Sequence, residues 1–157
     1  MPALDFFEGI ERDRQHIERL KQDMADLDSR IGPKAQGFEP TVRGGGGADR
    51  MLGLALVAMK LDELRAEMPN LERRLEQRIE RATDVLYGRS GRGGLAKATC
   101  TDDADMLRFH YLQGETWASI ARRYEPETTN LTVWCKHRAK WSCRQIDRIG
   151  MDVLADS

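Results

Sequence analysis

Two long stretches of this sequence repeat apolar residues every three or four positions, and this spacing restricts the fold more than any other feature. The first stretch runs from Ile10 to Ile31 and the second from Leu54 to Leu86. Such spacing places the apolar side chains on one side of an α-helix, whereas a half-buried strand alternates every second residue. The first stretch also keeps the steps of a coiled-coil seam. We therefore expect an all-α protein that begins with two long helices.

Glycine and proline residues predict where these helices end. The pair Gly32–Pro33 suits the end of a first helix over about 4–31, because glycine caps helices and proline cannot continue them. Asp49 is a suitable N-cap for a second helix that reaches Tyr87. The segment between them, 32–48, is rich in glycine and proline. Ordering such a backbone costs much entropy, so we expect a flexible loop here.

The second helix contains Pro69, which removes one backbone hydrogen bond and predicts a kink or a break just before it. The apolar seam continues beyond this proline, which favours a kink. Two helices joined by a loop pack most simply side by side, so we expect residues 1–87 to form an antiparallel helical hairpin. A two-helix seam buries little surface, and we therefore expect a homodimer through these N-terminal helices.

A Gly/Arg-rich segment at 88–100 separates the predicted hairpin from the rest of the chain. It begins GRSGRGGLAKAT and follows neither a helical nor a strand period. This composition is typical of a linker or of a tight structured loop. Residues 101–157 would then form a domain of their own.

The last third of the chain has the pattern of a three-helix unit with a helix-turn-helix. A first helix is expected from Asp102 to Gly114, and Thr116 is placed to cap a short second helix. In that second helix Trp117, Ile120, Ala121 and Tyr124 would face inward. The remaining parts of the motif are Ala121 where the helices cross, Glu125–Glu127 as the turn, Thr128 or Thr129 as the next cap, and Leu131 with Trp134 as apolar anchors.

Charge is distributed unevenly along a chain whose net charge is only -1. Residues 1–87 hold 14 basic and 17 acidic residues, whereas 128–150 hold five basic residues and a single acid. Basic residues neutralise DNA phosphates, and polar side chains on a recognition helix reach base edges. The expected base-reading residues are Thr129, Asn130, Thr132, Val133, Lys136 and His137. The expected phosphate contacts are Thr116, Arg122, Arg123, Arg138, Lys140 and Arg144.

The segment Tyr111–Ala121, reading YLQGETWASIA, resembles the Y-x-x-G-x-[ST]-W-x-x-I-A stretch of sigma-70 region 4. The whole layout is similar to small sigma-like phage regulators of late genes, of the ArpU and RinA type. The resemblance implies binding to double-stranded DNA and transcriptional regulation of phage or prophage genes, with RNA polymerase as a candidate partner. Glu125 and Pro126 stand where the family usually has glycine, and an extra turn residue would move the base-reading face by one position.

Other classes of function find less support in the sequence. The three histidines have no visible nucleophile as a partner, so we expect no enzyme and no cofactor. Cys135, His137 and Cys143 do not have the paired spacing of a structural zinc site, and we expect no metal. The chain opens with acids and has no apolar run of membrane-spanning length, so we expect a cytoplasmic protein in a bacterial host cell with no membrane contact. The alternative function is a structural adaptor, such as a terminase small subunit or a coiled-coil partner-binding protein.

Overall fold

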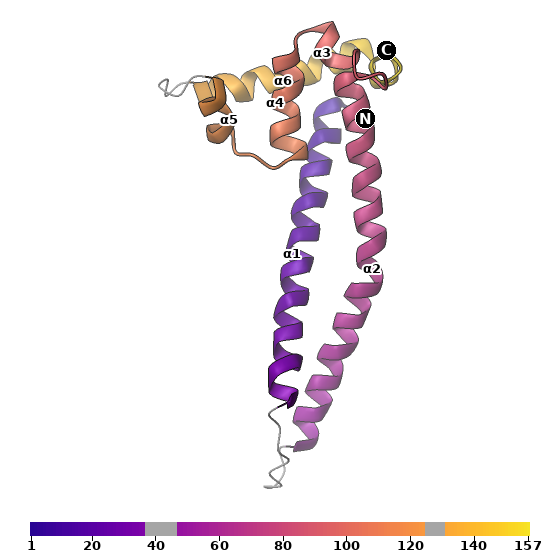
Figure 1. The fold of residues 1–157 in the computed structure, drawn as a ribbon, viewed down its shortest axis with the longest axis vertical. Coiled ribbons are helices and arrows are strands. Elements are labelled where there is room, and N and C mark those ends of the chain that lie inside the picture. Colours follow the sequence, from indigo (N-terminus) through magenta and orange to yellow (C-terminus); the bar gives the residue numbers. More distant parts are fainter. Residues whose placement is uncertain (37–46, 125–130) are drawn as a thin grey trace. The chain divides into compact units, whose positions relative to one another are not determined.

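The computed structural model describes residues 1–36, 47–124 and 131–157, and the regular structure in these ranges is helical throughout (Figure 1). The predicted all-α class is therefore confirmed. The elements are α1 Ala3–Gln36, α2 Gly47–Tyr87, α3 Gly94–Ala98, α4 Thr101–Leu107, a π-helical turn η1 Arg108–Leu112, α5 Trp117–Tyr124, α6 Leu131–Ile149 and α7 Met151–Ala155.

The described residues form two compact units. One unit joins residues 1–13 to residues 75–157, and the other consists of residues 14–74. The predicted boundary at residue 87 lies inside the first unit, because the first turns of α1 and the last turns of α2 contribute to its core. We call these the core unit and the helix-pair unit.

The core unit buries apolar side chains that come from distant parts of the sequence. Phe7 and Ile10 of α1 pack in one cluster with Leu86 of α2, Leu107 of α4 and Ile146 of α6. All five are completely buried or nearly so. The backbone N–H of Ala3 also donates to Asp147 Oδ1 at 2.7 Å. The N-terminal turn of α1 is therefore part of this core.

The helix-pair unit consists of two helices that run in opposite directions. Lys21 Nζ lies 2.8 Å from a Glu72 carboxylate oxygen, and Arg65 Nη2 lies 3.3 Å from Asp28 Oδ1. The later residue of α1, Asp28, pairs with the earlier residue of α2, Arg65, so the two helices are antiparallel here. Between them the buried side chains are Ile17, Leu61, Leu64 and Met68.

α1 continues past the proline that was expected to end it, and α2 continues past the proline at which a kink was favoured over a break. The prediction that the first helix ends at Ile31 is wrong, because α1 runs through Pro33 to Gln36. A proline removes a single backbone hydrogen bond, and the last turns of a helix can replace that bond with water. The alternative of a break at Pro69 is also wrong, because α2 is continuous over Gly47–Tyr87.

The Gly/Arg-rich segment is a tight structured loop. The Gly93 N–H donates to the Tyr87 carbonyl at 2.8 Å, and Leu95 of α3 is fully buried. Gly94 has a φ of +63°, and a Cβ at this position would lie 2.5 Å from the Tyr87 nitrogen. Only glycine fits such a close approach with a positive φ. These glycines therefore allow the backbone to double back against the end of α2.

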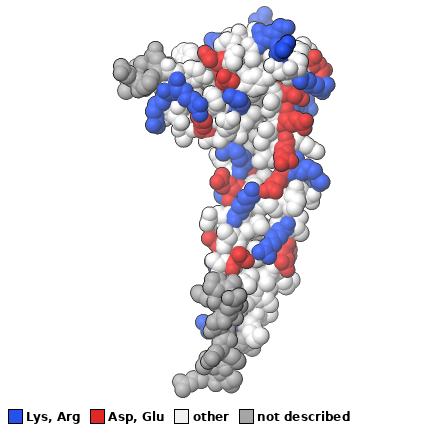
Figure 2. Space-filling view, viewed as in Figure 1, with Lys and Arg blue, Asp and Glu red and all other residues white. Residues whose placement is uncertain are grey.

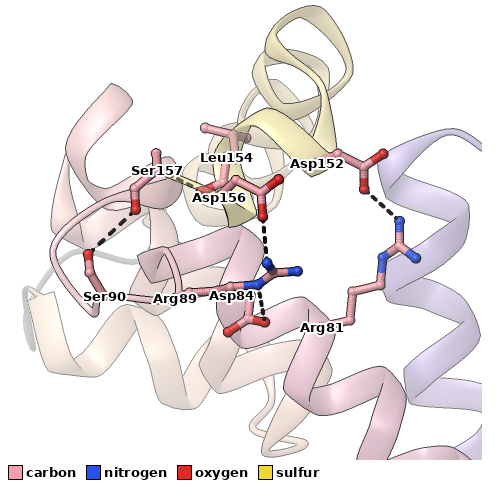
Figure 3. A network of polar contacts seen from close by, with 8 residues as sticks. All are labelled: Arg81, Asp84, Arg89, Ser90, Asp152, Leu154, Asp156 and Ser157. Atoms are coloured by element: carbon pink, nitrogen blue, oxygen red, sulfur yellow. Dashed lines mark hydrogen bonds and ion pairs between the residues drawn. The ribbon is translucent and has the colours of Figure 1, made fainter.

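Ion pairs fasten the same loop and α2 to the end of the chain. Arg89 Nη1 lies 2.9 Å from Asp156 Oδ1, and Arg81 Nη2 lies 3.0 Å from Asp152 Oδ1 (Figure 3). The Ser157 hydroxyl accepts a hydrogen bond from the Gly94 N–H at 2.7 Å. Residues 88–100 were predicted to separate the hairpin from the C-terminal domain. In the structure they instead contact α7 and the residues after it directly.

Candidate nucleic-acid interface

The segment Tyr111–Ala121 runs from the end of η1 into α5, which has a capped start and a buried inner face. Gly114 takes a φ of +78°, which ends the preceding helical turns. Thr116 Oγ1 then accepts a hydrogen bond from the Ser119 N–H at 3.2 Å, as a helix N-cap does. Ile120 and Ala121 are buried one turn later. The expected cap and these expected inward positions are confirmed.

Trp117 is held against the preceding turn by an aromatic stack. Its ring and the His110 ring are 3.9 Å apart between centroids and are inclined by only 21°. His110 Nδ1 lies 2.8 Å from the Glu115 carbonyl oxygen. The two contacts fix η1 to the start of α5 and so set the direction in which α5 leaves the core.

The inner face of α6 differs from the predicted one. Cys135 packs against Met106, Ile120 and Ala121, and Leu131 lies half-buried beside this cluster. Trp134, predicted as an inward anchor, is 49% exposed, so that prediction is wrong. Successive residues on a helix are rotated by about 100°, and the face through Cys135, Ala139 and Ile146 turns the neighbouring Trp134 outward.

The outer face of α6 carries four basic residues at intervals of four. We call Lys136, Lys140, Arg144 and Arg148 the basic row, and all four are exposed. Residues spaced by four lie on one side of a helix. None of them forms an ion pair with the part of the chain that the structure describes. The acid of α6, Asp147, accepts the hydrogen bond from the Ala3 N–H.

The predicted base-reading residues are distributed unevenly over this face. Val133, Lys136 and His137 are exposed, and Thr132 is half-buried. Thr129 and Asn130 lie outside the described residues, as do the predicted turn and the next cap. The structure therefore places three of the six residues on the solvent side of α6.

Arg138, predicted to contact phosphate, is engaged within the core unit. Its Nε lies 2.6 Å from Asp103 Oδ1 and its Nη2 lies 3.0 Å from Asp103 Oδ2. Asp103 is only 1% exposed, so the guanidinium neutralises a buried carboxylate. The hydrogen bonds to Asp103 raise the pKa of Arg138. This residue joins α6 to α4, and its charge is not free for a ligand.

The two arginines of α5 also differ from each other. Arg123 donates to both carboxylate oxygens of Glu115, at 3.0 Å for the Nε contact, and its guanidinium carbon lies 4.3 Å from the Phe109 ring centroid. Arg122 is exposed, and its Nε donates to the Ala118 carbonyl at 3.3 Å. Figure 2 shows Lys and Arg side chains gathered over α5. Arg122 and Thr116 remain accessible there, whereas the charge of Arg123 is paired.

A groove of about 340 Å³ borders the basic row on one side. Lys136 and Lys140 line it together with Glu8 and Glu11 of α1 and the ring of Trp117. The positively charged surface therefore ends at these two carboxylates. The sequence does not reveal this limit, since Glu8 lies more than a hundred residues from Lys136 and only the fold brings them to one groove.

The cysteines of the chain are free thiols. Cys135 and Cys143 are buried and Cys100 is exposed. Burial raises the pKa of the Cys143 thiol to about 12, so this thiol stays protonated at neutral pH. Among the described residues no group of His, Cys, Asp and Glu has the arrangement of a metal site. None of the described helices has both the length and the apolar character that crossing a bilayer requires.

Comparison with known protein families, with curated proteins and with solved structures found no match to this chain. The assignment of a function therefore depends on the surface of α5 and α6 and on the resemblance of Tyr111–Ala121 to sigma region 4.

Proposed function

We propose that this protein binds double-stranded DNA through α5 and α6, which act as a helix-turn-helix with α6 in the major groove. The observation that carries the proposal is the basic row on α6. Four exposed cations on one side of a helix form the positive stripe that binds a phosphate backbone, and the acid on the same side of α6, Asp147, accepts the hydrogen bond from the Ala3 N–H. The domain around them has its own packed core, which would hold α6 rigid on the duplex.

The packing between α5 and α6 supports the helix-turn-helix assignment. The motif needs a small residue where its helices cross, and Ala121 is buried against Cys135 at this place. The cap at Thr116 gives α5 a defined start. In such units the N-terminal part of the second helix reads base edges. Val133 and His137 are exposed in this part of α6.

The residues divide into three roles in this proposal. Val133, Lys136 and His137 face the bases. The phosphate contacts come from Lys140, Arg144, Arg148, Arg122 and Thr116. Arg138 instead fixes the helix to α4 through Asp103. Arg148 joins the set because it continues the spacing of four, although it was not among the residues expected from the sequence.

The regulatory role rests on the resemblance to sigma region 4. It would make the protein a regulator of phage or prophage genes that works in the cytoplasm of a bacterial host, with RNA polymerase as a further partner. An adaptor function, such as that of a terminase small subunit, is the second candidate. The observation that favours it is the exposed apolar surface on α2, which a regulator of promoters does not require.

A binding measurement with two matched double variants tests the proposal. Lys140→Ala/Arg144→Ala removes two members of the basic row, and Arg73→Ala/Arg74→Ala removes two exposed arginines from α2. Losing two phosphate contacts should weaken binding to a labelled duplex by roughly tenfold or more at low salt. The control variant should bind like the wild type. No binding by the wild type, or equal losses in both variants, would contradict the proposal.

Selection from a random-sequence DNA library separates the two candidate functions. A regulator should enrich a defined site that it prefers by roughly a hundredfold or more over random DNA. An adaptor that holds DNA through its backbone should bind without enriching a site. Both candidate functions include DNA binding, so this selection decides between the functions. The double variants above test where on the protein the DNA binds.

A further inference from the structure

The first turns of α2 expose an unusual amount of apolar surface. Met51, Leu52, Leu56 and Met59 are each between 58% and 72% exposed. Together with the exposed Ala55 between them, we call these residues the outer α2 patch. Figure 2 shows this part of α2, next to the residues drawn in grey, without charged side chains over most of its surface. Single exposed apolar residues need no explanation, but a contiguous group of long ones marks an interaction surface.

The patch lies on the side of α2 that faces away from α1. The side toward α1 is marked by the buried residues Leu61, Leu64 and Met68. With about 100° between successive residues, the positions 52, 55, 56 and 59 point in the opposite direction. The seam between α1 and α2 therefore cannot cover the patch.

The patch is also sharply bounded along the helix. Asp62 and Glu63 follow Met59 on the same side of α2, and both are exposed. Glu67 continues the acidic surface one turn later. Beyond Met59 the outer side of α2 is thus an ordinary solvated helix face, and the apolar character is confined to the first turns.

We propose that the outer α2 patch binds the same patch of a second copy of this chain, with the two α2 helices antiparallel. A two-fold axis between residues 55 and 56 places Leu52 opposite Met59 and the small Ala55 opposite the larger Leu56. Leu52, Ala55, Leu56 and Met59 then each meet an apolar partner, as a self-complementary interface requires, whereas Met51 lies opposite Lys60 at the edge of the interface. A parallel pair would bring Asp62, Glu63 and Glu67 against the same acids of the other copy.

The size of the patch sets the expected strength of this dimer. Side chains so exposed present on the order of 400 Å² per copy, and a pair would bury about 800 Å², against ~1,200 Å² for the smallest specific stable interfaces. The dimer should therefore dissociate at roughly micromolar concentrations. The inference does not depend on DNA binding, because self-association is measured without DNA.

Sedimentation equilibrium of the full chain tests the association. The wild type should shift from monomer to dimer as its concentration rises through the micromolar range. Leu56→Glu should remain a monomer with unchanged helical circular dichroism, because it buries a charge at the centre of the interface. Ala66→Glu adds the same charge to the same side of α2 beyond the patch and should still dimerise. A monomeric wild type, or a dimer that survives Leu56→Glu, would overturn the proposal.

Disulfide trapping tests the antiparallel orientation. In a Cys100→Ser background, Ala55→Cys places thiols beside the two-fold axis, and Ala66→Cys places them about 30 Å apart. A disulfide needs Cα atoms within about 7 Å. Oxidation should therefore cross-link the Ala55→Cys chain and leave the Ala66→Cys chain uncoupled. Efficient cross-linking of both variants would show a parallel pair, and cross-linking of neither would show that the patch is not the interface.

Discussion

The core unit and the helix-pair unit use the same apolar spacing and reach very different degrees of burial. All the large side chains that are fully buried among the described residues belong to the core unit, from Phe7 to Ile146. The helix-pair unit buries Ile17, Leu61, Leu64 and Met68 without enclosing them as completely. Its α2 exposes a row of Leu and Met side chains, from Met51 to Met59, on the opposite side.

The difference follows from the number of helices that surround each residue. In the core unit, α1, α2, α4 and α6 all contribute to one cluster, so an apolar side chain is covered from several directions. Among the described residues of the helix-pair unit, α1 and α2 pack only against each other, so an apolar side chain is covered from one direction. The core unit can therefore hold a rigid binding surface, whereas the helix pair offers surface to a partner.

The largest expected effect is at the ion pair that joins α4 to α6 in the core unit. Arg138→Ala leaves the Asp103 carboxylate buried without its counter-charge, and breaking such a pair costs about 3 kcal/mol or more. The urea midpoint of unfolding should fall accordingly. Lys140→Ala, on the exposed side of the same helix, should change the free energy of unfolding by less than about 0.5 kcal/mol. If the two variants unfold alike, the ion pair does not stabilise the core unit.

Two glycine substitutions should have opposite signs in the two units. Gly94→Ala forces a Cβ into the contact with the Tyr87 nitrogen at a positive φ, and we expect a loss of about 2 kcal/mol. Gly53 lies inside α2, and apart from the neighbouring backbone of α2 itself no described atom lies within 4 Å of the position that an alanine methyl group would take, so Gly53→Ala should stabilise by about 0.5–1 kcal/mol. Thermal unfolding monitored by circular dichroism measures both. If both substitutions changed the stability in the same direction, the loop and α2 would not differ in their requirement for glycine.

The smallest expected effect is at an exposed ion pair of the helix-pair unit. Lys21 and Glu72 are largely exposed to solvent, and such pairs contribute little to stability because water and salt screen them. Lys21→Ala should leave the unfolding midpoint within experimental error at physiological salt. A clear loss there would mean that the unit depends on its ion pairs more than on its short apolar seam.

The sequence allowed the local features of the fold to be predicted. The helical class, the cap at Thr116 and the buried pair Ile120 and Ala121 each depend on residues within one or two turns of each other, so their spacing is visible in the chain. The basic row could also have been found completely, because Arg148 continues the spacing of four from Lys136.

The features that were missed depend on contacts between distant residues. The sequence predicted that Arg138 is a free cation, but the fold pairs it with Asp103, which lies 35 residues away in the chain. Trp134 was expected to face the core, but the packing of Cys135 against Met106 and Ile120 sets the rotation of α6. The Gly/Arg-rich loop is ordered by Ser157 and Tyr87, and spacing within the loop does not reveal either contact.

The salt dependence of DNA binding tests the central claim most directly, namely that the core unit binds duplex DNA through the basic row on α6. With four charged phosphate contacts, from Lys140, Arg144, Arg148 and Arg122, the logarithm of the association constant should fall with the logarithm of salt concentration with a slope of about -3.6. Lys140→Ala/Arg144→Ala should reduce the slope by roughly 2, whereas Arg73→Ala/Arg74→Ala should leave it unchanged. A slope that stays the same in the first variant would contradict the claim.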